Sequence, residues 1–310
     1  MSLMKIKLTI LAIFVIFLSA CQDCNAKKTY NSGHLKRLLI TKKCPRCDLS
    51  GADLSNADLA GADLREAELS AAKLDGANLS NADLTGAELR WRDDIGDKGK
   101  MGVAEIGDFS CNVTYEATLI GVNLEGAKLA GVDLSYLDLS GANLSNADLE
   151  GANFESSDLA NANLDLANLK RANLRSASLN NANLRNASLT AANLASSDLR
   201  NANLTQANLN STILMYAKMY DTILIGAKLK NSDLYHADLI RAFLADTDLQ
   251  GADLSNAIFK NANLVGANLQ NSRYDSTTEW TDAYYDKQTI FPSGFDENIK
   301  QQMRLYKDKK

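Results

Sequence analysis

The chain has 310 residues and a formal net charge of −5, from 33 basic and 38 acidic side chains. This acidic balance disfavours a general affinity for the nucleic acid backbone, which proteins bind through Lys and Arg. With only two histidines and five cysteines, the chain offers few ligands for zinc, and we expect neither a metal nor a cofactor.

Residues 1–20 have the composition of a signal peptide. Two lysines precede an apolar run from Leu8 to Leu18. A run of about 11 residues is shorter than the roughly 20 that span a bilayer, which disfavours a permanent transmembrane anchor. Leu18-Ser19-Ala20-Cys21 resembles the bacterial lipobox, and this resemblance implies cleavage before Cys21 and acylation of its thiol. The alternative is a secreted protein cut nearby, in which Cys21 is incidental.

The mature chain would carry a net charge of −7, because residues 1–20 contain two Lys and no acid. Gln22 after the cysteine resembles the default signal for outer-membrane sorting, if the organism is Gram-negative. We therefore expect an exported protein that is lipid-anchored to the bacterial envelope. Residues 21–34 are polar and predict a tether. Residues 35–43 begin with helix-compatible apolar spacing and predict a short N-terminal helical cap. Membrane binding is the alternative for this segment, and its short length disfavours it.

Leucine or a close substitute recurs at every fifth residue for most of the chain. The phase holds over nine repeats from Leu49 to Leu89 and over 31 repeats from Leu119 to Leu269. Five residues advance about 500° on an α-helix and alternate between the faces of a strand, so neither regular element explains the pattern. A small residue two positions before each Leu would point to the same side in extended backbone. The pattern predicts a solenoid that turns once per repeat around a leucine core.

The motif Ala-(Asp/Asn)-Leu-X-X, as in Ala52-Asp53-Leu54-Ser55-Asn56, resembles the pentapeptide-repeat family across residues 44–274. This resemblance implies an all-β fold, a right-handed quadrilateral β-helix with four repeats per coil. The 40 repeats would form about ten coils and a rod about 50 Å long. Some members of the family protect DNA gyrase by imitating duplex DNA. Export disfavours that role here, as does an outward charge that is acidic in the first block and basic around residues 170–200.

Cys44-Pro45-Arg46-Cys47 is a CxxC pair, and in an exported protein this motif has three interpretations. Counting back from Leu49, Cys44 occupies a leucine position and Cys47 a small inward position, so a core role explains both. A local disulfide is the second interpretation. Redox catalysis or a metal site is the third, and a zinc site would need further ligands. Cys24 and Cys111 permit another bridge that the sequence does not assign.

The repeat breaks over residues 90–118 and resumes in phase at Leu119. The break is either an excursion loop or a set of degenerate coils in which Phe109 and Thr114 keep the register. We favour a loop over residues 90–106 followed by degenerate repeats. Because loops on rigid scaffolds often carry binding residues, Trp91 is a partner-binding candidate. The alternative is a neutral insertion.

Outward positions turn apolar between Ile213 and Leu244, whereas elsewhere they are mainly Ser, Asn, Asp or Gly. With four repeats per coil, residues 20 apart stack on one another, which gathers these apolar residues together. Contiguous exposed apolar surface often marks an interface; the alternative is a ladder that only stabilises coil stacking. The partner-binding candidates in this stretch are Met215, Tyr216, Tyr220, Ile223, Tyr235, His236, Ile240 and Phe243.

Residues 275–310 predict an irregular C-terminal cap and tail. Their aromatic residues can cover the last coil, and Pro292 and Gly294 predict a turn. The segment from Tyr285 to Asp296 is similar to the ending of many bacterial pentapeptide-repeat proteins.

We find no sequence pattern for an enzyme, because Asp and Asn recur at a fixed outward position and no nucleophile or phosphate-loop motif is present. The predicted function is that of a non-enzymatic, lipid-anchored envelope protein whose rod is a platform for an unidentified envelope protein. The alternative is a structural spacer without a specific partner. A homodimer is compatible with the sequence, and no nucleic acid partner is expected.

Overall fold

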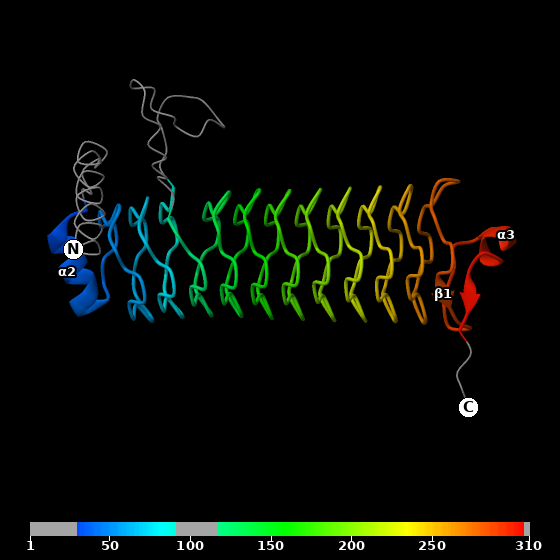
Figure 1. Ribbon diagram of the computed structural model, residues 1–310, viewed down its shortest axis with the longest axis horizontal. Coiled ribbons are helices and arrows are strands. Elements are labelled where there is room, and N and C mark those ends of the chain that lie inside the picture. The colour runs from blue at the N-terminus through cyan, green and yellow to red at the C-terminus, as the bar shows by residue number, and fades with distance from the viewer. Residues whose placement is uncertain (1–29, 91–116, 307–310) are drawn as a thin grey trace, which may run out of the picture.

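The computed structural model describes residues 30–90 and 117–306, which form a rod wound from successive coils (Figure 1). The helices and strands of the described residues lie at its two ends. Helix α2 (Ser32–Thr41) covers the N-terminal end. Strand β1 (Tyr284–Tyr285), helix α3 (Glu297–Lys300) and strand β2 (Arg304–Leu305) lie at the C-terminal end, where β1 and β2 pair in parallel.

Each regular coil contains four five-residue repeats. Isolated parallel bridges join residues 20 apart, so that Asn143 pairs with Asn163 and Asn163 pairs with Asn183. Leu164 N–H donates to the carbonyl of Asn183 (2.6 Å), and Asn183 N–H donates to the carbonyl of Ala162 (2.9 Å). Because such pairs recur on all four sides of the coil, the predicted quadrilateral β-helix is confirmed.

The leucine phase forms the core of the rod. Every described residue in this phase from Cys44 to Leu269 is at most 2% exposed. Phe154, Met219 and Phe259, which replace Leu, are as buried as the leucines around them. Burial of one large apolar side chain stabilises a fold by roughly 1.5–3 kcal/mol, so a continuous stack of this kind can offset the entropy of ordering the chain.

Each corner is a turn closed by a hydrogen bond between residues three apart, such as Ala162 N–H to the carbonyl of Leu159 (3.0 Å). The third residue of the turn adopts positive φ, as at Asn161 (60°). Gly and Asn reach this conformation most readily, which explains their frequency two positions after each Leu.

The break in the repeat leaves the coil continuous. Ala117 N–H donates to the carbonyl of Leu89 (3.1 Å), a bond that elsewhere joins residues three apart. Thr118 pairs with Lys73 at a separation of 45 rather than 20, so 25 chain positions are passed over. Ala117 therefore occupies the place of residue 92 in the coil. The expectation of a loop followed by degenerate repeats, with Phe109 and Thr114, falls on residues outside those described.

Both ends of the core are covered. Helix α2 begins three residues before the predicted cap, because the Asn31 side chain accepts hydrogen bonds from the N–H groups of Gly33 and His34. It buries Leu38 against the first coil. At the other end Trp280 stacks on Phe259, with ring centroids 4.7 Å apart. The pairing interval there lengthens from 20 residues to 21 at Glu279 and to 22 at Ile290.

Candidate interaction surface

Many outward side chains form polar ladders that bond from coil to coil. Asn163 donates through Nδ2 to Oδ1 of Asn143 (3.1 Å) and accepts from Nδ2 of Asn183 (2.8 Å). A second ladder runs through Asn153 and Asn173, with Nδ2 of Asn173 2.9 Å from Oδ1 of Asn153. These amides are largely satisfied by one another, so the ladders are the regular background against which other surface features stand out.

One ladder gives way to apolar residues in the C-terminal half of the rod. Asn203 pairs with Ile223, and Ile223 pairs with Phe243, before Asn263 restores the amide. Phe243 is 45% exposed. Ile225, at the neighbouring turn, is 39% exposed and was not among the candidates chosen from the sequence. We call Ile223, Ile225 and Phe243 the side patch. The sequence could have indicated Ile225, because an apolar residue directly after a core leucine stands at an outward position.

A second group gathers at a corner of the same coils. The rings of Tyr216 and His236 stack in near-parallel planes with centroids 5.1 Å apart. Tyr235 meets both rings edge to face, at 5.8 Å and 4.4 Å. Met215 lies beside them at the same turn and is half-buried. We call these four residues the corner patch. The rings pack on one another as a ladder does, yet Tyr216 keeps 52% of its surface exposed.

The corner patch and the side patch are separate. Lys218 and Asp238 pair with each other on the side of the rod that follows the corner patch in the chain. Lys218 is exposed there. The single contiguous apolar surface implied by the sequence is therefore divided by a charged side.

Tyr220 and Ile240 occupy the next corner, between the charged side and the side patch, and both are half-buried. Arg200 donates through Nη1 to the Tyr220 hydroxyl (2.9 Å) and through Nε to Asp198 (2.7 Å). Tyr220 is thus held by its own rod, which makes it a weaker contact candidate than Tyr216.

Two residues of the corner patch have an unfavourable backbone. Tyr216 (φ 58°) and His236 (φ 56°) stand at the turn position that prefers Gly or Asn. A left-handed conformation costs a residue with a Cβ atom about 1–2 kcal/mol. Local turn chemistry therefore does not account for aromatic rings at these two positions.

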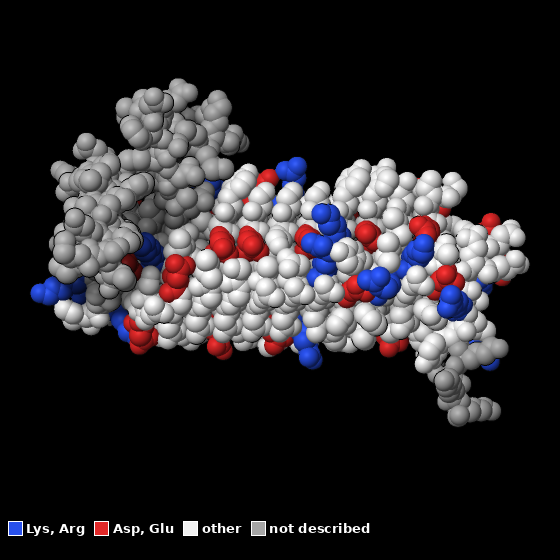
Figure 2. All heavy atoms as spheres, in the orientation of Figure 1, with Lys and Arg blue, Asp and Glu red and all other residues white. Residues whose placement is uncertain are grey.

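Most ion pairs of the described residues join side chains on neighbouring coils. Figure 2 shows Lys and Arg beside Asp and Glu along the C-terminal half of the visible face. Arg241 donates through Nε to Asp221 (2.8 Å), and this hydrogen bond lowers the pKa of the Asp221 carboxyl. Arg273 binds Asp253 and lowers the pKa of that carboxyl to about 2. The described surface therefore mixes ion pairs with neutral amides.

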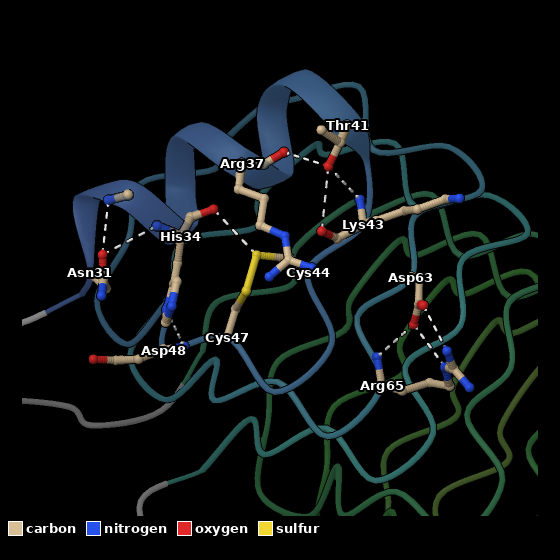
Figure 3. Close-up of a disulfide and its surroundings, with 11 residues drawn as sticks. Asn31, His34, Arg37, Thr41, Lys43, Cys44, Cys47, Asp48, Asp63 and Arg65 are labelled. Carbon is tan, nitrogen blue, oxygen red and sulfur yellow. Dashed lines mark hydrogen bonds and ion pairs between the residues drawn. A yellow bond between two sulfur atoms is a disulfide. The ribbon is translucent and has the colours of Figure 1, made fainter.

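Cys44 and Cys47 form a disulfide under helix α2 (Figure 3). They are 0% and 1% exposed, so the two cysteines occupy core positions and also form a local disulfide. Sγ of Cys44 lies 3.2 Å from the carbonyl oxygen of His34, and His34 Nδ1 accepts a hydrogen bond from Asp48 N–H (3.0 Å). Thiol–disulfide exchange needs access to a sulfur atom, which this burial denies.

Other candidates lie outside the described residues, namely Cys21, Cys24, Trp91 and Cys111. Within residues 30–90 and 117–306, no three His, Cys, Asp or Glu side chains are grouped so as to hold a metal ion. No helix in these ranges is long and apolar enough to cross a membrane.

Comparison with known families identifies the architecture. The family model for pentapeptide repeats matches eight copies, over residues 47–86, 115–146, 138–175, 167–206, 192–231 and 232–271. The chain belongs to the pentapeptide-repeat family. Members of this family are generally structural or interaction proteins rather than enzymes.

Solved pentapeptide-repeat proteins resemble this rod to different degrees. HetL from the cyanobacterium Nostoc sp. strain PCC 7120, involved in heterocyst differentiation regulation, is 27% identical with a TM-score of 0.57; the match covers 86% of this chain and 99% of HetL. QnrB1, a plasmid-mediated fluoroquinolone resistance protein, is 20% identical with a TM-score of 0.40, covering 61% and 86%. A thylakoid-lumen protein of Arabidopsis thaliana is 28% identical with a TM-score of 0.30, covering 31% and 67%. No curated protein sequence matches significantly.

Proposed function

We propose that this pentapeptide-repeat protein is a non-enzymatic platform that is lipid-anchored to the bacterial envelope through Cys21 and binds an envelope protein through its corner and side patches. The observation that carries this proposal is the local loss of polar ladders. On a rod whose outward positions are mainly polar, large apolar side chains on two adjacent coils stay about half exposed. Exposed Tyr and Phe of this kind are enriched at protein interfaces.

Positive φ is general at this turn position and occurs with other large side chains, such as Tyr136 (62°) and Leu166 (60°), so the backbone does not distinguish contact from coil stacking. Support for contact comes from exposure, because Tyr216 keeps 52% of its surface exposed although its ring packs on its neighbours. HetL, which has a similar fold, is involved in the regulation of heterocyst differentiation. A regulatory rod can act by binding other proteins.

Export and anchoring rest on the sequence before Gln22. The Leu18-Ser19-Ala20-Cys21 motif after an apolar run supports acylation of Cys21. Two or three acyl chains, as on bacterial lipoproteins, would anchor stably where one chain alone is marginal. If the organism is Gram-negative, Gln22 supports the outer membrane as the location.

The capture test compares Tyr216→Asn and Phe243→Asn with the matched control Leu166→Asn. Leu166 has the same turn position as Tyr216, a φ of 60° and 53% exposure, but it lies outside both patches. After crosslinking in native cells, we expect a partner band that either patch variant weakens at least tenfold and the control preserves. Equal capture by all four proteins would contradict the platform. If the captured protein is a second copy of the chain, the patches form a homodimer interface.

Further measurements test the lipid anchor and distinguish the platform from the alternative functions. Mass spectrometry of the mature N-terminus should find an acylated Cys21, and Cys21→Ser should release the protein from the membrane fraction. A structural spacer, supported by the leucine core and the self-satisfied ladders, predicts diffuse crosslinking that no patch variant alters. A DNA-like role would require a continuous acidic surface, which the neutral ladders and ion pairs of the described sides do not support.

A further inference from the structure

Helix α2 does more than close the core, because its outer face carries exposed apolar and basic side chains. Leu35 and Leu38 face the first coil. Ile40 is 70% exposed, the highest value among the exposed large apolar side chains of the described residues, and Leu39 is 53% exposed. Lys36 and Arg37 precede Ile40 by four and three residues, so the three side chains share one face of the helix.

The N-terminal end also has a charge opposite to that of the rest of the protein. Between Tyr30 and Cys47 the sequence contains five basic residues and no acidic residue, whereas the whole chain has a net charge of −5. Figure 2 shows basic side chains at this end of the rod. Lys42 and Arg46 form ion pairs with Asp58 and Glu66 of the coils below. Among the described residues, no ion pair joins Lys36 or Arg37 to an acid.

We infer that the outer face of α2 binds the surface of an anionic lipid bilayer, with Ile40 and Leu39 entering the headgroup region and Lys36 and Arg37 pairing with lipid phosphates. Amphipathic helices with apolar residues on one face and Lys and Arg on the polar face lie at the interface between the lipid headgroups and water. Each basic side chain near an anionic surface strengthens binding by about fivefold. A soluble acidic protein would satisfy the charges, but it would leave the two adjacent aliphatic side chains without a defined place.

This contact deepens the proposed function and agrees with the position of the anchor. Asn31 follows Cys21 by only ten positions, and such a segment spans at most about 36 Å when fully extended. An acylated Cys21 would therefore keep α2 close to the membrane. Because α2 covers the end of the rod, contact through its outer face would stand the rod on the bilayer, with the two patches held away from the lipid (Figure 1).

The test uses the chain from Gln22 to Lys310, because an acyl anchor or the apolar run of residues 8–18 would bind vesicles by itself. Every residue of the described core lies between Leu38 and Met303, so this chain retains the whole core. Sedimentation with vesicles of 30% phosphatidylglycerol in phosphatidylcholine gives the partition coefficient. We expect Leu39→Ser/Ile40→Ser to lower it at least tenfold and Lys36→Gln/Arg37→Gln to lower it about 25-fold. Binding should weaken in 0.5 M NaCl.

Matched controls change the same chemistry away from α2. Ile120→Ser removes an isoleucine that is 49% exposed, and Lys228→Gln/Lys260→Gln removes two exposed charges; both should bind as the parent does. Equal binding to pure phosphatidylcholine, or no effect of the α2 variants, would overturn the inference. So would displacement of the vesicles by soluble polyglutamate at equal charge concentration, which would show a general polyanion site. The protein used in the vesicle assay lacks the acyl group. A lack of vesicle binding would therefore contradict membrane contact by α2 without bearing on Cys21 acylation. An unacylated Cys21 would contradict the lipid anchor without changing the result of the vesicle assay.

Discussion

At the scale of single residues, position in the five-residue phase outweighs residue type. Leu164 and Leu166 stand two residues apart; the first is fully buried and the second is 53% exposed at a turn. The phase places one side chain in the core and the other in solvent. Hydrophobicity alone would assign both to the core.

This difference predicts opposite mutational effects. Leu164→Ala should lower the free energy of unfolding by about 2–5 kcal/mol, because it removes a buried side chain and leaves a cavity. Leu166→Ala should change it by at most about 0.5 kcal/mol, as exposed substitutions usually do. Urea unfolding followed by circular dichroism measures both. A similar loss in the two variants would show that the turn leucine packs more closely than its exposure indicates.

The ion pair of Asp253 and Arg273 predicts a pH dependence. The pKa of Asp253 is lowered from its ordinary 3.8 to about 2, first by hydrogen bonding to Arg273, so folding is favoured by the ionised carboxylate. Its contribution is present above the ordinary pKa of 3.8 and is lost as the pH falls through the folded value of about 2. Arg273→Gln should therefore be less stable than the parent at pH 7, and the difference should be largely gone at about pH 1. Thermal unfolding at the two pH values checks this; a constant difference would contradict it.

At the scale of elements, the amide ladders join neighbouring coils by side-chain hydrogen bonds. In other β proteins, long strands are joined mainly by backbone hydrogen bonds. Each side of the coil contributes one paired residue to the isolated bridges, so side chains as well as backbone join neighbouring coils. Asn163 both donates to Asn143 and accepts from Asn183. The ladder therefore connects several coils through one type of side chain.

Loss of one rung should weaken the stack measurably. Asn163→Ala removes the two rungs to Asn143 and Asn183 and the bond accepted from Asp165 N–H, and we expect it to lower the free energy of unfolding by about 1–2 kcal/mol. Lys228→Ala, at an equivalent outward position with an exposed side chain, should cost at most about 0.5 kcal/mol. The comparison is made by chemical denaturation at neutral pH. Equal costs would mean that the ladder follows the coil geometry without stabilising it.

At the scale of the whole molecule, the rod depends on an unbroken count of five. The coil passes from Leu89 to Ala117 with 25 positions left out, a multiple of the repeat. Deletion of residues 92–116 would place Leu119 five positions after Leu89 and keep every core residue in phase.

We therefore expect the 25-residue deletion to fold with a melting temperature within a few degrees of the parent. Deletion of residues 92–115, one residue fewer, should lower the melting temperature strongly, because it moves the next leucine out of the core position. Circular dichroism and thermal unfolding compare the two. Equal stability of both deletions would show that the coils can re-register around the junction.

The sequence by itself determined the core, the outward positions and the inward placement of Cys44 and Cys47, because a five-residue phase sorts side chains through covalent order alone. Only the tertiary structure decided which outward residues meet. It divided the predicted apolar surface at Lys218 and Asp238, bound Tyr220 to Arg200 and paired Thr118 with Lys73. The physical reason is that the neighbour of an outward side chain lies a full coil away, so its contacts and exposure depend on how the coils close and stack.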